Sequence, residues 1–248
     1  MGENTRTRIY EYVKYIYKSF IIDYDYEKRG NDCVLFLHGW GGNKRSFDVC
    51  APFVKKFSTL KISFPPYKEY SSLQSLSMFD YVNIVCNILQ LLNINDPIVV
   101  CHSFGCRVAL ILNKRIKLKK LVICSGAGIK PRYKKIRSLN QTKKWLDNRD
   151  LHFNNAIGST DYMAVADIDR TTFKNVVNLN LKNLIKCFTC PTLIYWGKLD
   201  KETPMYMCSY FHKHIPNAEC HVVDYGHFAY LENKQNFCYR LKIFLGEK

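Results

Sequence analysis

The sequence predicts an α/β fold with a mostly parallel, doubly wound sheet. Short apolar runs alternate with longer stretches in which apolar residues recur every three or four positions. This alternation is typical of buried parallel strands joined by helices that cover both faces of the sheet. A chain of 248 residues can also bury a large core without disulfides. The expected strands are Cys33–Leu37, Leu60–Phe64, Ile98–Cys101, Leu121–Cys124, Thr192–Trp196 and Cys220–Val223.

Three segments between or after these runs have a helical pattern. In the first of them the apolar residues follow the spacing of one helix face, at Phe79, Val82, Val85, Leu89 and Leu92. Residues 10–22 are expected to add an extended segment at the edge of the sheet. The expected helices are Ser77–Leu92, Phe104–Leu112 and Asn233–Leu245.

The alternation of strands and helices is interrupted once. From about residue 129 to residue 189 the sequence is polar and basic, and it has no buried-strand pattern. The alternation resumes at "PTLIYWG". We therefore expect a core made of residues 1–128 and 190–248, with a small helical cap, residues 129–189, inserted after the sixth strand.

The charge of the chain is strongly positive, at +16 from 37 basic and 21 acidic residues. A basic surface attracts nucleic acid, membranes or acidic ligands. The basic residues are dispersed, however, and neither zinc-finger spacing nor an RNA-binding aromatic motif accompanies them. We therefore expect no specific nucleic-acid binding. No apolar run approaches the length of a membrane span either.

The start of the chain lacks the basic-then-apolar pattern of a signal peptide, which favours a cytoplasmic location. The 11 cysteines are then expected to be reduced thiols, mostly packed as small apolar groups. The C-x-x-C motif at residues 187–190 has no second pair at zinc spacing. His212 and His214 are spaced for different faces of a helix, so no metal site is expected.

One serine lies where an apolar run ends and a helical pattern begins. The stretch "VVCHSFGCRV" at residues 99–108 places Ser103 at this turn. A side chain on such a sharp turn stands above the carboxyl edge of the sheet, and the small Gly105 lets the two elements approach each other. Free N–H groups at the start of the helix would stabilise an oxyanion there. Ser103 is therefore a candidate nucleophile, whereas His102 is expected to pack within the turn and point away from Ser103.

Two further residues at strand ends supply what a serine nucleophile needs. A serine hydroxyl requires a general base, and His227 in "DYGHF" follows the expected strand Cys220–Val223. The base in turn needs a carboxylate that holds its tautomer. Asp200 in "WGKLD" follows a strand and a glycine turn, and Asp224 is the alternative. Strand ends of a parallel sheet share one edge, so Ser103, His227 and Asp200 can meet there.

A glycine-rich stretch, "LFLHGWGGNK" at residues 35–44, also follows an expected strand. Glycines let the backbone curve and expose an N–H group toward a ligand. The backbone N–H groups of Trp40 and Phe104 are expected to form a two-donor oxyanion hole. Supporting roles in the loop are expected for His38, Gly39 and Gly41.

These four pieces resemble the α/β-hydrolase superfamily, in the branch of small esterase-like and C–C-hydrolase-like members. The resemblance runs from about residue 30 to the end of the chain, and it rests on "HGWGG", "HSFG", "WGKLD" and "GHFAYLE" in the chain order serine, acid, histidine. The chain departs from the family at Cys101 and Cys106, where family members usually have glycine. It also departs in "SFPPYKEYSS", which lacks the usual aspartate and glycines of that loop.

The resemblance implies a serine hydrolase that acts through an acyl-enzyme on small carboxylic esters. The substrate would be a small-molecule ester or a related acyl compound, and neither a metal nor an organic cofactor is required. Three other reactions of the same fold stay open as alternatives, namely C–C bond hydrolysis, thioester hydrolysis and amide hydrolysis. A non-catalytic module that binds a ligand in the same pocket is the alternative from another functional class.

Overall fold

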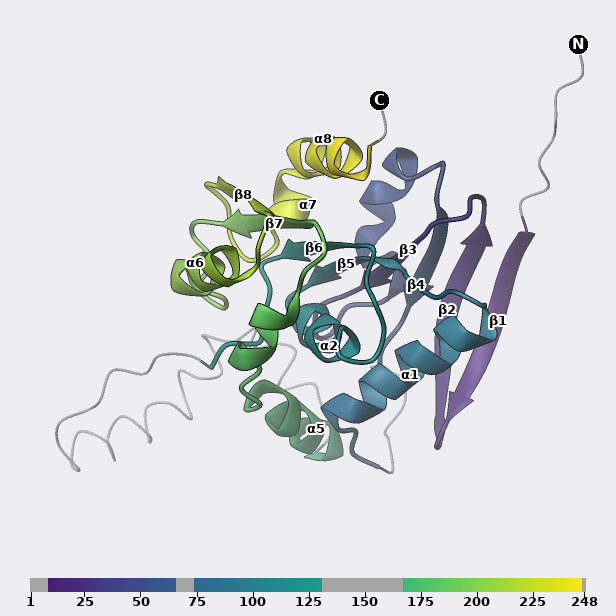
Figure 1. Cartoon of the computed structure of the whole chain (residues 1–248). Coiled ribbons are helices and arrows are strands. Elements are labelled where there is room, and N and C mark those ends of the chain that lie inside the picture. Colours follow the sequence, from purple (N-terminus) through teal and green to yellow (C-terminus); the bar gives the residue numbers. More distant parts are fainter. Residues whose placement is uncertain (1–8, 66–73, 131–166, 247–248) are drawn as a thin grey trace, which may run out of the picture.

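One eight-stranded sheet organises the fold, in the order β1-β2-β4-β3-β5-β6-β7-β8 (Figure 1). The structure is a computed structural model, and it describes residues 9–65, 74–130 and 167–246. β2 runs antiparallel to both of its neighbours, β1 and β4, and all other neighbouring pairs are parallel. The strands are β1 Ile9–Tyr17, β2 Phe20–Lys28, β3 Cys33–Leu37, β4 Ser58–Ile62, β5 Ile98–His102, β6 Lys120–Cys124, β7 Thr192–Gly197 and β8 Ala218–Val223.

The α/β fold with a mostly parallel sheet is confirmed, and the six expected core strands are all present. β3 has the predicted bounds, whereas β4 begins and ends two residues earlier than predicted. The edge segment expected at residues 10–22 is part of a longer antiparallel hairpin, β1 and β2. The turn of this hairpin contains Lys18 with a positive φ of 54°. The pattern of apolar residues in the sequence does not indicate the position of this turn.

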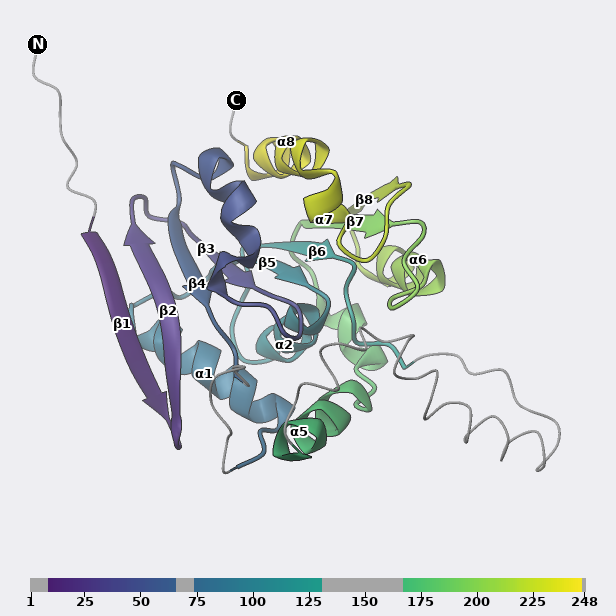
Figure 2. The same cartoon turned by 180° about the vertical axis from the view of Figure 1, so that it is seen from behind.

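Helices cover both faces of the sheet (Figures 1 and 2). Side chains of α1, α2 and α6 join the buried cluster on one face, and those of η1, α7 and α8 join the cluster on the other. No helix in the described ranges is long and apolar enough to cross a membrane. The helices are η1 Lys44–Phe53, α1 Met78–Leu91, α2 Phe104–Leu112, α5 Asp167–Val177, η2 Lys182–Cys187, α6 Met205–His214, α7 Ala229–Glu232 and α8 Lys234–Leu245.

α1 begins where the sequence predicts, because Ser77 caps it. The Ser77 side chain accepts a hydrogen bond from the N–H of Asp80, and the Asp80 carboxylate accepts one from the N–H of Ser77. Such a reciprocal capping box satisfies two N–H groups that the helix itself leaves unpaired. The predicted face is confirmed at Val82, Val85 and Leu89, which are buried, and it is wrong at Phe79, which is 58% exposed.

The order in which successive strands are added to the sheet changes direction at β3. β3 is followed by β4 on one side, and the chain then crosses back so that β5 pairs with the other side of β3. Open α/β sheets bind ligands in the crevice at such a switch point, outside the carboxyl ends of the strands. The loop after β3 and the turn after β5 therefore lie next to each other at the edge where a ligand is expected.

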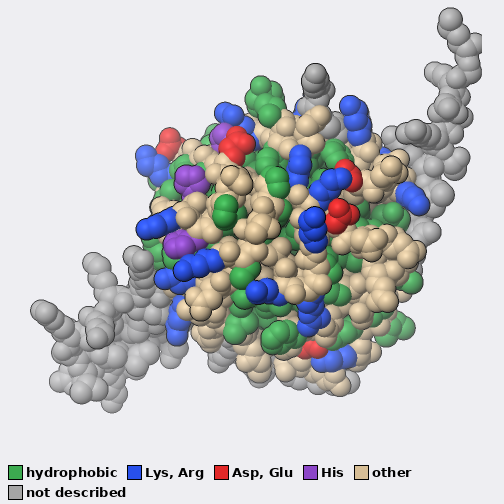
Figure 3. Space-filling model, viewed as in Figure 1, with side chains coloured by type: hydrophobic (Ala, Val, Ile, Leu, Met, Phe, Trp, Pro, Cys, Tyr) green, Lys and Arg blue, Asp and Glu red, His purple; other side chains and the backbone are tan. Residues whose placement is uncertain are grey.

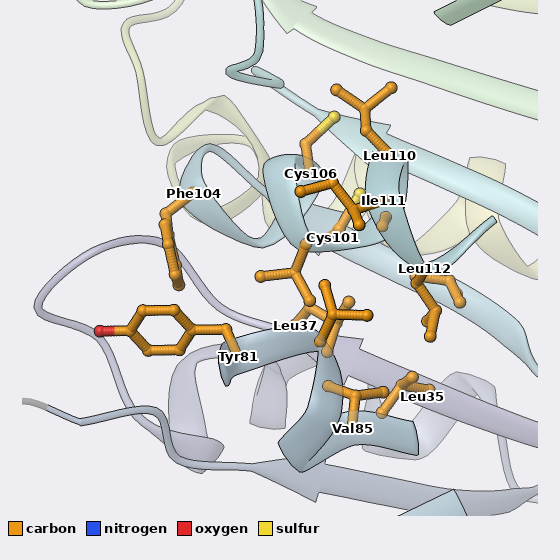
Figure 4. Close-up of a cluster of buried hydrophobic side chains, with 14 of the residues drawn as sticks. Leu35, Leu37, Tyr81, Val85, Cys101, Phe104, Cys106, Leu110, Ile111 and Leu112 are labelled. Carbon is orange, nitrogen blue, oxygen red and sulfur yellow. The ribbon is translucent and has the colours of Figure 1, made fainter. Parts of the chain in front are cut away.

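α2 packs closely on β3. Figure 4 shows the buried cluster to which both elements contribute, with Leu37 from β3 and Cys106 from α2. A Cβ atom at Gly105 would lie 2.1 Å from the carbonyl oxygen of Leu37 and 2.9 Å from that of His38. Backbone atoms cannot move aside as a flexible side chain can. Only glycine therefore lets the helix begin this close to the strand.

The expected cap, residues 129–189, falls largely on residues 131–166, which lie outside the described ranges, so its bounds stay a prediction. The part that is described, α5 and η2, is tied to the core through α2. The buried guanidinium of Arg107 donates hydrogen bonds to the carbonyl oxygens of Leu179 at 2.7 Å and Val177 at 3.1 Å. Burial lowers the pKa of Arg107 to about 10, which still leaves the side chain charged at neutral pH.

The close approach of α2 to β3 can be tested by Gly105→Ala. The added methyl group should reduce the free energy of unfolding by about 1–3 kcal/mol, because it overpacks a site bounded by backbone carbonyls. Urea unfolding followed by circular dichroism measures the loss. Gly226→Ala is the matched control, since its Cβ would meet Glu232 Oε1 at an ordinary 3.5 Å. Equal stability of the two variants would contradict the close packing.

Candidate active site

Ser103 occupies a strained turn between β5 and α2. Its backbone φ and ψ are 44° and −108°, a combination that residues other than glycine rarely adopt. Strain of this kind persists only where the surroundings hold it, and it clusters at functional sites. Here the N–H of Ser103 donates to Cys124 O at 3.2 Å, and its carbonyl accepts from the N–H groups of Cys106 and Ala127. The side chain itself is partly exposed.

The predicted acid and base are hydrogen-bonded to each other. His227 Nδ1 lies 2.9 Å from Asp200 Oδ2, and both side chains are buried. Asp200 follows β7 and His227 follows β8, so two neighbouring parallel strands deliver them to the same edge of the sheet. The alternative acid, Asp224, is 82% exposed and pairs with Lys198 at 3.5 Å. Of the two candidate acids, Asp200 is therefore the one that contacts His227.

Asp200 is held in its ionised form by its partners. Burial by itself would raise the pKa of Asp200, but the hydrogen bond and positive potential of His227 and the hydrogen bonds from Thr203 outweigh it and lower the pKa. Asp200 Oδ1 accepts from the N–H groups of Glu202 and Thr203 at 2.9 and 2.8 Å. Asp200 Oδ2 accepts from the Thr203 hydroxyl at 2.6 Å. Its four hydrogen bonds fix the carboxylate opposite His227.

His102 connects the serine turn to the histidine loop. Its Nε2 lies 3.0 Å from the carbonyl oxygen of His227, and the centroids of the two rings are 4.7 Å apart. Burial is the main reason that its pKa falls to about 3, so the ring is neutral and Nε2–H donates to this carbonyl. His102 packs within the turn as predicted, and it also supports the backbone that carries His227.

His38 supports the loop after β3. Its Nε2 accepts a hydrogen bond from the N–H of Phe64 at 2.9 Å, which assigns the proton to Nδ1. Nδ1–H then donates to the carbonyl oxygen of Gly39 at 2.7 Å. Burial lowers the pKa of His38 to about 4, so this neutral tautomer persists at neutral pH. The ring thus links the ends of β3 and β4 and holds the curve of the glycine-rich loop.

The two expected oxyanion donors lie on adjacent segments of the same edge. The ring of Trp40 packs edge-on against that of Phe104, with centroids 5.4 Å apart. Among the described residues, neither backbone N–H has a hydrogen-bond partner. Gly39 is buried and Gly41 is exposed with a φ of 72°, and the N–H of Gly42 closes the turn on Gly39 O at 3.0 Å. Both donors are therefore available to a ligand atom.

The predicted nucleophile and the predicted base are not hydrogen-bonded to each other. In the described structure no hydrogen bond joins Ser103 Oγ to His227, and His227 Nε2 instead lies 3.2 Å from Glu202 Oε2. Catalytic hydrogen bonds are often long before a substrate is bound. The structure thus places Ser103, His102 and the His227–Asp200 pair at one edge, with the Nε2 atom of the base facing a second carboxylate.

Two residues of the site, Thr203 and Glu202, were not predicted from the sequence. Thr203 orients Asp200, and its carbonyl accepts a hydrogen bond from Trp196 Nε1 at 2.8 Å. The signal that could have found it is the pattern Asp-x-x-Thr, because an aspartate after a strand commonly bonds the N–H groups two and three residues on. No comparable pattern points to Glu202, whose contact with His227 depends on the tertiary fold.

The described residues contain no group of three or more histidine, cysteine or acidic side chains that could hold a metal ion. His212 and His214 both lie in the last turn of α6, and His214 Nδ1 bonds the carbonyl of Tyr210.

The expected cap, residues 129–189, includes several aromatic residues and a methionine. Of these, Tyr162 and Met163 lie outside the described ranges. Phe173 of the same segment packs on the ring of Trp40, with centroids 5.1 Å apart.

The neutral state of His38 predicts how stability depends on pH. Unfolded histidine binds a proton below about pH 6.5, whereas buried His38 does so only near pH 4. The unfolded state therefore binds more protons between these values, and stability falls as the pH falls, by about 1.4 kcal/mol per pH unit. In His38→Gln this part of the slope should vanish. Urea unfolding of both proteins between pH 6 and pH 4.5 measures it, and identical slopes would contradict a neutral His38.

Part of the chain is similar in sequence to known proteins. A family model described as the alpha/beta hydrolase fold matches residues 138–234. The chain is 31% identical over 96 residues to a Mycoplasma genitalium protein that carries the name esterase/lipase 2, a match that covers 37% of this chain and 36% of that protein. The chain thus aligns with just over a third of the length of this relative.

Solved structures show the same fold over nearly the whole chain. An esterase from Exiguobacterium antarcticum superposes with a TM-score of 0.72 at 15% identity, covering 91% of this chain and 96% of that one. A meta-cleavage product hydrolase from Pseudomonas fluorescens superposes with a TM-score of 0.67 at 18% identity, covering 92% and 95%. The sheet and these structures together show that the chain has the α/β-hydrolase fold, and part of the chain is similar to the family model and to the Mycoplasma protein.

Proposed function

We propose that the protein is a serine esterase that cleaves small carboxylic esters with Ser103, His227 and Asp200. The observation that carries the proposal is the buried hydrogen bond of 2.9 Å between His227 Nδ1 and Asp200 Oδ2. It lies at the same sheet edge as the strained turn of Ser103. A buried, oriented imidazole at the same edge as a partly exposed serine serves acyl transfer, and a relative named as an esterase/lipase supports esters as the substrate class.

Each of these groups has a role in the proposed reaction. Asp200 accepts a hydrogen bond from Nδ1–H of His227, which holds the tautomer with a lone pair on Nε2. Nε2 removes the proton of the Ser103 hydroxyl as its oxygen attacks the ester carbonyl carbon, and the carbonyl π pair moves onto oxygen. The N–H groups of Trp40 and Phe104 donate to that oxyanion, an interaction that typically contributes about 3–4 kcal/mol per donor.

The intermediate then collapses, and the bond between the carbonyl carbon and the leaving oxygen breaks. His227, now protonated at Nε2, gives its proton to the departing alkoxide, so an alcohol leaves. Water repeats the sequence on the acyl-enzyme, with His227 again as base, and releases the carboxylic acid. No step in this scheme uses an organic cofactor or a metal ion.

The role of Ser103 is tested by covalent labelling with a fluorophosphonate. The wild-type protein should carry a single adduct on Ser103, because attack on phosphorus needs the same base and oxyanion donors as attack on an ester. Ser103→Ala should carry none and should lose hydrolysis of p-nitrophenyl esters. Intact-protein and peptide mass spectrometry locate the adduct. A folded wild-type protein that neither labels nor turns over any ester in a chain-length panel would favour the non-catalytic ligand-binding module.

The assignment of the acid is tested by two matched aspartate variants. Asp200→Asn should lower kcat/KM by roughly 10⁴-fold, because an amide in place of the carboxylate no longer holds the Nδ1–H tautomer. Asp224→Asn removes an exposed carboxylate that pairs only with Lys198, so its kcat/KM should stay within about twofold of wild type. Steady-state kinetics on one ester compare them, and a larger loss in Asp224→Asn would reverse the assignment.

Amides, thioesters and substrates of C–C bond hydrolysis are processed by the same serine and base in related folds, so labelling does not separate them. Direct comparison of kcat/KM on an ester, an amide and a thioester with one common acyl group does. Esters should be hydrolysed fastest by at least tenfold. A faster thioester or amide would replace the ester assignment while leaving the roles of Ser103 and His227 intact.

A further inference from the structure

Glu202 places a second carboxylate at the reactive nitrogen of His227. Its Oε2 atom lies 3.2 Å from His227 Nε2, and its side chain is 39% exposed. Nε2 is the atom that exchanges protons with Ser103 and with the leaving alcohol in the proposed reaction. Glu202 therefore lies beside the position through which the leaving group departs.

The two nitrogen atoms of the His227 ring have different carboxylate partners, Asp200 at Nδ1 and Glu202 at Nε2. A neutral ring carries one proton, so it can donate a hydrogen bond to one of these carboxylates. The carboxylate of Asp200 accepts a hydrogen bond from Nδ1–H, so neutral His227 presents a lone pair at Nε2. A carboxylate oxygen opposite a lone pair is repelled unless a positive charge or a proton lies between them. Glu202 is thus satisfied when Nε2 carries a proton or when a cation lies nearby, and it lacks a suitable partner in the resting neutral site.

Glu202 has no lysine or arginine partner among the described residues. No nitrogen of either residue type lies within ion-pair distance of its carboxylate, and its one ionic contact is with His227. A carboxylate that is not paired with lysine or arginine in a protein of charge +16 is available to a ligand. Several other carboxylates do have a lysine or arginine partner, as in Lys18–Asp80, Arg29–Glu27, Lys44–Asp23, Lys44–Asp25, Lys61–Asp48 and Lys119–Asp32.

An exposed aromatic ring contacts the same imidazole. Phe228 is 47% exposed, and its ring packs edge-on against His227 with centroids 5.3 Å apart. A quaternary or protonated amine is attracted both to a carboxylate and to the face of an aromatic ring. Glu202 and Phe228 thus provide, around one histidine, the two kinds of group that recognise a substituted ammonium ion.

We propose that Glu202 is a specificity-determining residue that selects esters whose leaving alcohol carries a cationic nitrogen, with Phe228 as the aromatic partner. The inference rests on the proposed esterase function and names its substrate class. A leaving group with an ammonium ion pairs with Glu202 and draws the carboxylate away from Nε2, which frees Nε2 for Ser103. When His227 becomes protonated, Glu202 lies between two positive charges and stabilises both.

The test compares two esters that differ only in charge, a choline ester and the 3,3-dimethylbutyl ester of the same acid. In the second ester a carbon replaces the nitrogen, so size and shape are conserved. The acyl group is the one that the wild-type enzyme hydrolyses fastest in an alkyl-ester panel. In the wild-type enzyme the choline ester should have the higher kcat/KM, and in Glu202→Gln the ratio of the two values should fall about fivefold, as expected for a partly exposed ion pair.

Two further measurements separate this selectivity from a structural effect. Glu219→Gln removes the carboxylate of the other histidine–glutamate pair, Glu219–His221 on β8, and should leave the ratio unchanged. Glu202→Asp should restore part of the preference for the cationic ester. Raising the salt concentration from about 0.05 to 0.5 M should weaken the wild-type preference through screening.

The outcomes distinguish this inference from the function on which it rests. A wild-type enzyme that hydrolyses the neutral ester through Ser103 but shows no preference for the cationic one would overturn the role of Glu202 and leave the esterase assignment standing. An unchanged ratio in Glu202→Gln would do the same. A folded enzyme that hydrolyses no ester of the panel would overturn the esterase assignment itself.

Discussion

The site depends on one geometric constraint, the alignment of parallel strands that end at the same edge of the sheet. β3 and β5 are paired in register, with Leu37 opposite Cys101, so the glycine-rich loop and the serine turn emerge side by side. β7 and β8 are paired in register as well, from Thr192–Ala218 to Gly197–Val223. Four loops that are far apart in the sequence therefore meet without any of them having to be long, and the backbone hydrogen bonds of the sheet fix their separation.

Three buried histidines at this edge of the sheet differ in the groups that surround their rings. His38 and His102 are surrounded by apolar groups and backbone carbonyls, so burial keeps them neutral, and each serves as a hydrogen-bonding support. His227 is also buried, but its ring lies between the carboxylates of Asp200 and Glu202. The ring of His227 therefore differs from the two supporting histidines in having a carboxylate at each of its nitrogen atoms.

The fold and most of the candidate site could be predicted from the sequence because they rest on local patterns. Buried strands such as Cys33–Leu37 are continuous apolar runs, and Ser103 and Gly105 carry the signal of a tight strand-to-helix turn. The hairpin of β1 and β2 was predicted only in part, since its turn at Lys18 uses a residue that does not mark turns. The predicted buried face of α1 was wrong at Phe79, because an apolar residue beside the N-terminus of the helix fits the helical spacing whether or not a neighbour covers it. Glu202 left no local signal, because its partner lies 25 positions away in the sequence.

The short loop after β7 has three different effects on one imidazole. Asp200 accepts a hydrogen bond from Nδ1–H, and Thr203 fixes Asp200 through both its N–H and its hydroxyl. Glu202, between them in the sequence, has its N–H bound to Asp200 while its side chain turns back to Nε2. The same turn that orders the acid therefore also aims the second carboxylate. Replacing Glu202 changes the charge at Nε2 without removing a hydrogen bond from Asp200, because the backbone N–H of position 202 remains. With the roles proposed for Asp200 and Glu202, orientation of the base and selection of the leaving group can thus vary independently within one loop.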